Sequence, residues 1–216
     1  MEQFPLLLPF DRTLHTLDLS AFTEPRRTVC VDLGCGKGRF LLNHAARHPD
    51  EFLIGADRLI HRLAKIDAKA RKMGIQNVRL VHADAGLLVG CLLPARSVDV
   101  FFVFFPDPWP KRRHHKRRLF SPPMLDAFHR TLKPCGTIHI ATDHAEYHKV
   151  ILTLFSADRR FAPAPACEPP DEEKTDFELI FMAKGKRIYR CSFASLPEPA
   201  SENESRPATA NPVSMA

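Results

Sequence analysis

The sequence predicts an α/β fold, in which helices cover both faces of an open, mainly parallel, twisted sheet in a Rossmann-like arrangement. Apolar, strand-like segments alternate along the chain with segments whose apolar residues recur at helical spacing. The first apolar run closes on a glycine-rich turn, Asp32 to Gly38, that leads directly into a helical segment. With 216 residues and 44% hydrophobic content, the chain can bury one substantial core, so we expect one domain with appendages.

The alternation defines the expected elements in order. Expected strands cover residues 28–33, 52–57, 77–82, 98–105 and 137–141, and expected helices cover residues 39–48, 59–73 and 122–133. The fourth strand is apolar almost throughout, as in a parallel strand that is covered on both faces. Sheets of this kind bind ligands at the carboxyl ends of their strands, so we expect the functional residues there.

The C-terminal third is less regular. Residues 162–170 are rich in proline and are expected to form a loop. Thr175 and Glu178 then have the spacing of a capping box, which predicts a short helix ending near Gly185. Residues 187–193 alternate like a last strand. We therefore expect an N-terminal extension at residues 1–27, a domain at residues 28–193 and a disordered polar tail at residues 194–216.

Composition restricts the cellular context and the partners. The net charge of +6 is compatible with a polyanionic partner. The six cysteines form no C-x-x-C pair and the eleven histidines show no ligand spacing, so no metal is expected. The stretch from Leu6 to Leu8 is too short for a signal peptide, and no segment is long enough to cross a bilayer. We expect a cytoplasmic protein without a membrane partner.

The glycine turn favours one class of cofactor. Gly34 and Gly36 allow the backbone to approach a ligand, but the spacing is G-x-G-x-G and not the G-x-G-x-x-G of dinucleotide-binding turns. Asp32 would repel a pyrophosphate, whereas it would attract the ammonium and sulfonium groups of S-adenosylmethionine. The pattern therefore predicts S-adenosylmethionine and makes a nicotinamide oxidoreductase remote.

Further acids follow at the ends of the next expected strands. Asp57 lies where an acid meets ribose hydroxyls in this class of fold, and Asp84 is placed to reach an adenine amino group. Either acid alone could simply cap a turn. Three acids in register with a glycine turn favour the cofactor site.

A second motif follows the fourth expected strand. The segment Phe104 to Pro110 presents Asp107 and Trp109 between prolines, where a substrate would meet the methyl group. Residues 111–118 then hold six Lys or Arg and two His, a density that predicts contact with phosphate. Trp109 could stack on a displaced base or pack beneath the proline loop. By contrast, a solvated face is expected for the Lys and Arg side chains on the second helix: Arg58, Arg62, Lys65, Lys69 and Lys72.

Four motifs together resemble the bacterial tRNA (guanine-N7)-methyltransferase family: DLGCGKG, FPDPWPKRRHHKRR, ATD at residues 141–143 and TDFE at residues 175–178. The resemblance spans residues 28–193 and implies the class I methyltransferase form of the Rossmann-like fold. It implies that Asp107 is catalytic. It places these residues at the cofactor: Asp32, Gly34, Gly36, Asp57, Asp84 and Asp107. It places these at the substrate: Lys111, Asp143, Thr175, Asp176, Phe177 and Glu178. It places these at the RNA: Arg113, His114, His115, Lys116, Arg117 and Arg118.

The resemblance implies transfer of a methyl group from S-adenosylmethionine to N7 of a guanine in tRNA, in the variable loop. Guanine N7 carries a lone pair and no proton, so the reaction needs no obligatory base, and Asp107 would orient the base and stabilise developing positive charge. One departure is Asp176, which stands where the family usually has Lys or Arg. Two alternatives stay open: methylation of an exocyclic amine of RNA or DNA, and a catalytically silent RNA-binding homologue. A monomer and a homodimer are equally compatible with the sequence.

Overall fold

A computed structural model describes residues 5–8, 16–20 and 27–197. Its strands form a seven-stranded sheet in the order β3-β2-β1-β4-β5-β7-β6. The strands are β1 (Val29–Leu33), β2 (Phe52–Asp57), β3 (Val78–His82), β4 (Val98–Phe104), β5 (Leu132–Thr142), β6 (Phe161–Ala164) and β7 (Tyr189–Ser195). The helices are α1 (Arg39–Arg47), α2 (Ile60–Lys72), the one-turn α3 (Ala85–Leu87), α4 (Pro122–Thr131), α5 (Ala145–Ser156) and α6 (Asp176–Ala183). A π-helical turn, η1 (Leu88–Leu92), and a 3-10 helix, η2 (Arg112–Arg117), complete the set.

The sheet is mainly parallel, as the sequence predicts. Strands β1 to β5 pair in parallel, and β7 runs antiparallel between β5 and β6. The strand order reverses at β1, which lies between β2 and β4. In open sheets of this kind, the crevice at such a reversal is where ligands bind.

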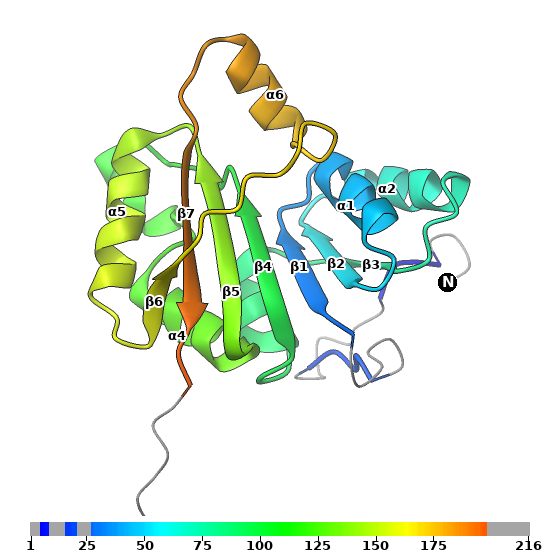
Figure 1. The fold of residues 1–216 in the computed structure, drawn as a ribbon, viewed down its shortest axis with the longest axis horizontal. Helices are drawn as coiled ribbons and strands as arrows, with labels where there is room; N and C mark the ends of the chain where they lie inside the picture. Colours follow the sequence, from blue (N-terminus) through cyan, green and yellow to red (C-terminus); the bar gives the residue numbers. More distant parts are fainter. Residues whose placement is uncertain (1–4, 9–15, 21–26, 198–216) are drawn as a thin grey trace, which may run out of the picture.

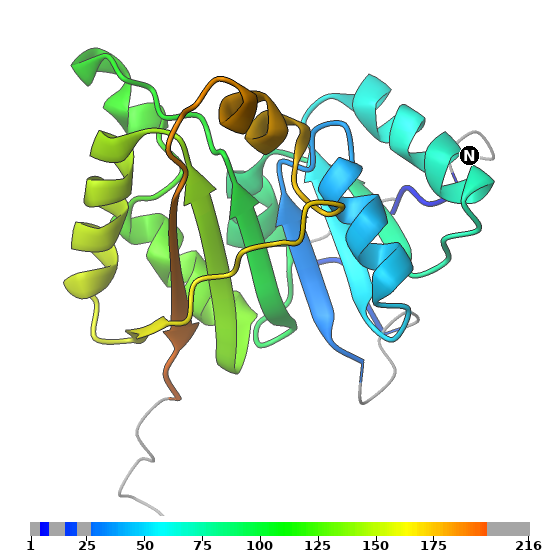
Figure 2. The ribbon, with the colours of Figure 1, turned by 45° about the horizontal axis from the view of Figure 1, so that its top comes forward.

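Two apolar clusters hold helices against opposite faces of the sheet. Helices α1 and α2 pack over the β1 to β3 half of one face, and η1, α4 and α5 pack on the other face. Figures 1 and 2 show α6 apart from both layers, above the carboxyl ends of the central strands. Strand β1 is buried at all five positions, because both of its faces are covered.

One glycine sets the distance between α1 and the sheet. Gly55 lies in the middle of β2, where an added Cβ would stand 2.3 Å from Cδ2 of Leu41 on α1. The absence of a side chain therefore lets α1 approach β2 closely, and α1 begins at the glycine turn of the predicted site.

The structure corrects several expectations for the C-terminal half. Helix α5 was not expected, although Tyr147, Ile151 and Phe155 fall at helical spacing and are all buried. The proline-rich range 162–170 is not entirely loop, because its first three residues belong to β6. Helix α4 ends at Thr131, before the expected end, because Leu132 is already extended and pairs with Val98 across a register shift.

The chain ends also differ from the expected domain limits. Strand β7 continues to Ser195, two residues into the expected tail, because Ala194 and Ser195 pair with β6. Residues 198–216 of that tail lie outside the described residues. At the other end, Leu7 forms a bridge with Leu80 of β3, and Leu8 is buried in the core. The described part of the N-terminal segment thus belongs to the packed domain.

Within the described ranges, no helix combines the length and the apolar character needed to cross a membrane.

We expect the aromatic cluster on α5 to contribute strongly to stability. Phe155 is 1% exposed and its ring stacks on Phe193 at a centroid distance of 4.0 Å. Phe155→Ala should lower the free energy of unfolding by about 3–5 kcal/mol, because it leaves a cavity between α5 and β7. Leu152→Ala is the matched control, since Leu152 lies on the same helix but is 37% exposed. Urea denaturation measures both changes, and equal losses would contradict the assignment of the core.

Candidate functional site

The glycine turn forms the floor of the site at the end of β1. Gly34, Gly36 and Gly38 have φ values of 82°, 58° and 74°, in the left-handed region that favours glycine. Gly38 also cannot carry a side chain because its Cβ would lie 2.7 Å from Cγ1 of Ile66 on α2. The turn therefore brings bare backbone to the crevice and starts α1 immediately behind it.

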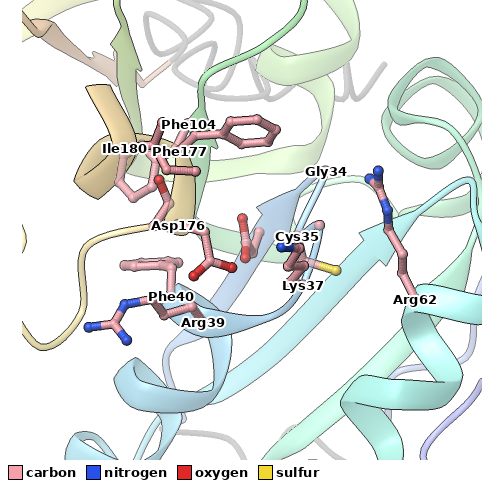
Figure 3. Close-up of a pocket in the computed structure, with 13 residues that line it drawn as sticks. Gly34, Cys35, Lys37, Arg39, Phe40, Arg62, Phe104, Asp176, Phe177 and Ile180 are labelled. Carbon is pink, nitrogen blue, oxygen red and sulfur yellow. The ribbon is translucent and has the colours of Figure 1, made fainter. Parts of the chain in front are cut away.

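A cavity that is open to solvent lies over this turn. Four parts of the chain form it: the turn after β1 with the start of α1, Arg62 of α2, the end of β4 and the start of α6 (Figure 3). The lining residues are Asp32, Gly34, Cys35, Gly36, Lys37, Arg39, Phe40, Arg62, Phe104, Thr175, Asp176, Phe177 and Ile180.

Asp32 is the acid that the structure places most clearly at the cavity. Its side chain lines the cavity although the residue is only 5% exposed. Burial raises the pKa of Asp32 to about 7, with the charge of His44 acting against this rise and that of Asp57 adding to it. Among the described residues, no donor hydrogen-bonds to its carboxylate. The positive charge of a bound cationic ligand would lower the pKa of Asp32 and favour its ionised form.

Asp57 stands behind the turn and holds it. Its carboxylate accepts hydrogen bonds from the backbone N–H of Gly36 at 3.2 Å and of Leu59 at 2.8 Å. Arg62 reaches back from α2 to Asp57 at 3.3 Å and lines the cavity. The expectation of a solvated outer face is thus wrong for Arg62, which Figure 3 shows at the cavity wall.

Asp84 occupies a different environment. It is exposed, does not line the cavity and accepts a hydrogen bond from the backbone N–H of Leu87 at 2.9 Å, which caps α3. The simple capping role that the sequence left open is therefore present in the structure. A contact between Asp84 and adenine stays a prediction.

Asp107 lies on an exposed loop that is strained and firmly anchored. Phe105 and Trp109, on either side of it, have φ values of 56° and 41°, which cost non-glycine residues on the order of 1–3 kcal/mol each. The backbone N–H of Phe105 donates to the carbonyl of Ala141 at 2.7 Å. Backbone strain that surrounding contacts hold in place is typical of functional loops. Here those contacts fix the backbone on both sides of Asp107.

Arg118 anchors the other end of this loop. Its Nε donates to the carbonyl of Pro108 at 2.8 Å, its Nη2 lies 3.2 Å from Glu146, and its guanidinium lies over the ring of Tyr147. The residue is only 8% exposed. Its position suits a support for the Asp107 loop better than a contact with RNA.

The rest of the predicted RNA-binding run lies on η2 at the surface. Arg113, Lys116 and Arg117 are exposed, whereas His114 and His115 are half-buried. The guanidinium of Arg117 lies 4.9 Å above the Trp109 ring, and His114 meets the same ring edge-on. Trp109 is therefore engaged by its own loop, which corresponds to the packing alternative.

The residues at the start of α6 divide into two groups. Thr175 caps the helix by accepting from the backbone N–H of Glu178 at 3.1 Å, and Asp176 and Phe177 line the cavity. Glu178 is fully buried and its carboxylate pairs with Arg190. Its side chain therefore does not accept a hydrogen bond from the backbone N–H of Thr175, and the expected capping box is incomplete. Burial raises the pKa of Glu178, while the charge of Arg190 opposes the rise.

The remaining predicted substrate residues lie outside the cavity. Lys111 is exposed beside η2. Asp143 is ion-paired at 2.5 Å with Lys186, whose ammonium also lies over the Phe181 ring. Asp143 therefore ties the end of β5 to the loop that follows α6.

Several cavity residues were not predicted. Phe104 is the last residue of β4 and Phe40 lies in the first turn of α1, so their place next to the strand ends was a usable signal. Ile180 enters the cavity from one turn into α6, which only the tertiary placement of that helix reveals.

Comparisons with known proteins identify the family of this chain. A family described as "Putative methyltransferase" matches residues 26–191. The tRNA (guanine-N(7)-)-methyltransferase of Halorhodospira halophila is 36% identical over 191 residues, covering 85% of this chain and 82% of that protein. The enzyme of the same name from Nitrosococcus oceani is 34% identical over 178 residues, covering 82% and 75%.

A solved structure extends the agreement to the fold. The 16S rRNA (adenine(1408)-N(1))-methyltransferase of Catenulisporales acidiphilia, determined with its cosubstrate SAM, has a TM-score of 0.55 at 17% identity. The match covers 82% of this chain and 88% of that one. This likeness supports a class I methyltransferase fold. The matched family and the identity over most of the length of these relatives show that the chain belongs to the tRNA (guanine-N7)-methyltransferase family.

Proposed function

We propose that this protein transfers a methyl group from S-adenosylmethionine to N7 of a guanine in tRNA. The observation that carries the proposal is the buried Asp32 carboxylate, which lines an open cavity over a left-handed glycine turn. Membership of a family whose named relatives are tRNA (guanine-N(7)-)-methyltransferases supports the choice of substrate. We further propose that the target guanine lies in the variable loop and that the protein acts in the cytoplasm.

The residues present fit the cofactor. S-adenosylmethionine carries an ammonium and a sulfonium, and both attract the buried Asp32 carboxylate. The glycines at the turn let the backbone approach the ligand, and Phe40 and Phe104 offer apolar surface. When bound, the cofactor supplies an electrophilic methyl group on its sulfonium.

The chain's own residues supply positioning and electrostatic stabilisation. Guanine N7 brings its own lone pair, so no residue has to remove a proton before the methyl group is transferred. Positive charge develops on the purine as the methyl moves, and a carboxylate at Asp107 stabilises that charge and orients the edge of the base. The strained, anchored loop limits the movement of Asp107, so that little reorganisation accompanies the reaction.

The basic surface on η2 provides the complement to RNA. Arg112, Arg113 and Lys116 are exposed beside the Asp107 loop, where they can neutralise tRNA phosphates. Folded tRNA can bury a guanine in tertiary pairing, so the target nucleotide opens locally before it reaches Asp107.

The direct test of the proposed function is the identity of the product. Incubation with labelled S-adenosylmethionine and bulk tRNA, digestion to nucleosides and mass spectrometry should give 7-methylguanosine. A nucleoside methylated on an exocyclic amine would instead support the rival methyltransferase. Cofactor binding without any methylated nucleoside would support the silent RNA-binding homologue.

Asp107→Asn tests the role of the acid at the reacting base. The change should lower kcat on the order of 10²-fold, because it removes charge stabilisation in the transition state. It should leave S-adenosylmethionine affinity within about twofold, because Asp107, which was expected at the cofactor, is not among the residues that line the cavity. Asp50→Asn is the control, since Asp50 is an exposed acid away from the cavity. A variant at Asp107 with nearly normal kcat would remove this residue from the mechanism.

The salt dependence of tRNA binding tests the basic surface. Replacing Arg112, Arg113 and Lys116 with Ala should weaken binding and lower the slope of log K against log salt by about one for each phosphate that is no longer neutralised. The matched control replaces Lys65, Lys69 and Lys72 of α2, which should leave the slope unchanged. Equal effects of the two triple variants would place the RNA elsewhere.

Arg118 needs a separate variant because it is buried under the loop. Arg118→Gln should lower kcat and keep the salt slope of the wild type, since the side chain holds Pro108 and not a phosphate. If the slope of log K against log salt concentration were about one smaller in magnitude than in the wild type, Arg118 would contact a phosphate of the RNA.

A further inference from the structure

Residues 167–174 form a strap that connects the sheet to the wall of the cavity. The strap leaves β6, crosses the face of the sheet that α1 also covers and enters α6 at Thr175 (Figures 1 and 2). Cys167 packs against the apolar cluster on this face. Since Thr175, Asp176 and Phe177 line the cavity, the path of the strap determines where that wall stands.

Helix α6 has little apolar packing of its own. Phe177, Ile180 and Met182 are 54%, 45% and 46% exposed, and Glu178 is its one buried residue. Its apolar packing is limited, with the half-buried Phe181 in contact with Phe105. The buried Glu178–Arg190 pair and the polar contacts at the two ends of the helix supply the rest of its placement.

Helix α1 holds the strap through three contacts. Arg39 Nε donates to the carbonyl of Lys174 at 3.0 Å, and Asn43 Nδ2 donates to the carbonyl of Glu172 at 2.5 Å. The next residue, His44, has its Nδ1 2.6 Å from Oε2 of Glu173. Arg39 and Asn43 are neighbours on one side of α1 at i, i+4 spacing, and His44 lies about a quarter of a turn around the helix from Asn43.

Glu173 is the buried centre of this contact. It is 3% exposed, and its second oxygen, Oε1, lies 2.8 Å from Nε of Arg47. The other ring nitrogen of His44, Nε2, lies 3.1 Å from Oε2 of Glu51, which also accepts from the Cys30 thiol. His44 thus bridges a carboxylate of the strap and a carboxylate at the edge of β2.

The charges in the cluster balance when His44 carries a proton. Burial alone would lower the pKa of His44, but its hydrogen bonds to Glu51 and Glu173 outweigh burial and raise it. Arg47 supplies the second positive charge, and His48 lies 3.8 Å from each carboxylate. His44, His48 and Glu173 also have the spacing of metal ligands.

We propose that Glu173 and His44 are positioning residues for the cofactor site, because their ion pair fastens the strap to α1 and thereby sets α6 as the outer wall of the cavity. The same helix α1 starts at the glycine turn, so one rigid element carries the floor of the cavity and the anchor of its wall. The effect on cofactor affinity rests on the proposed function. The effect on α6 does not.

The first test measures hydrogen exchange in the free protein. Glu173→Ala should accelerate exchange of the α6 amides, residues 176–183, by about tenfold or more and leave the α5 amides unchanged. Glu172→Ala is the matched control, because the strap uses only the carbonyl of this exposed residue. Unchanged α6 exchange, or equal acceleration in α5 and α6, would overturn the proposal.

The second test measures S-adenosylmethionine affinity by calorimetry in a double-mutant cycle. Glu173→Ala and His44→Gln should each raise Kd about tenfold, and the double variant should be little worse than either single one, because both changes break the same pair. Additive losses of affinity would contradict the proposal that both residues act through one ion pair. Absence of binding to the wild-type protein would contradict the proposed function alone, since the exchange experiment contains no cofactor.

A chelator distinguishes the ion pair from a metal. Treatment of the wild-type protein with EDTA, followed by addition of Zn²⁺, should leave α6 exchange unchanged at each step. Acceleration by EDTA that Zn²⁺ reverses would show that a metal holds the strap, and would overturn the proposed pair.

Discussion

A carboxylate buried at the end of β1 is the constraint around which the candidate site is organised. Asp32 lies at the reversal of strand order, where the parallel strands β1 and β4 direct their carboxyl ends to one crevice. Burial without a donor makes the charged form of such an acid costly, so its pKa rises to about 7. A ligand with fixed positive charge reverses this penalty. The preference for a sulfonium cofactor thus follows from the sheet topology and the burial that it imposes.

The other parts of the site are arranged around this acid. Asp57 holds the glycine turn from behind, and Arg62 closes its side. The Asp107 loop approaches from β4 and is fixed by Arg118, while α6 covers the cavity and is fastened through Glu173. Cofactor, base and RNA are therefore addressed by different segments, each anchored by its own buried polar contact. This separation explains why the glycine turn indicates the cofactor, whereas the basic run on η2 indicates the nucleic acid.

The central elements were predictable from the sequence because their signals are local. Apolar runs predicted strands β1 to β4, and apolar residues at helical spacing predicted helices α1 and α2. The role of Arg62 was missed because periodicity locates the apolar side of a helix and does not show which exposed side chain turns toward a strand end. Glu178 and Arg118 look like exposed polar residues in the sequence, yet each is buried beside a partner from another element, Arg190 and Pro108. Such pairings join residues 10 or more positions apart, and only the tertiary fold brings them together.

The most direct test of this account counts the protons released when S-adenosylmethionine binds. Because Asp32 has a pKa of about 7 in the free protein and the cofactor's positive charge lowers it, binding favours the ionised acid, and affinity should rise as pH increases toward 7. Calorimetry at pH 7 in buffers of different ionisation enthalpy should show release of about half a proton per cofactor, and the same experiment on Asp32→Asn should show that this release has been abolished. No release from the wild-type protein, or equal release from both proteins, would contradict a site organised around the buried Asp32.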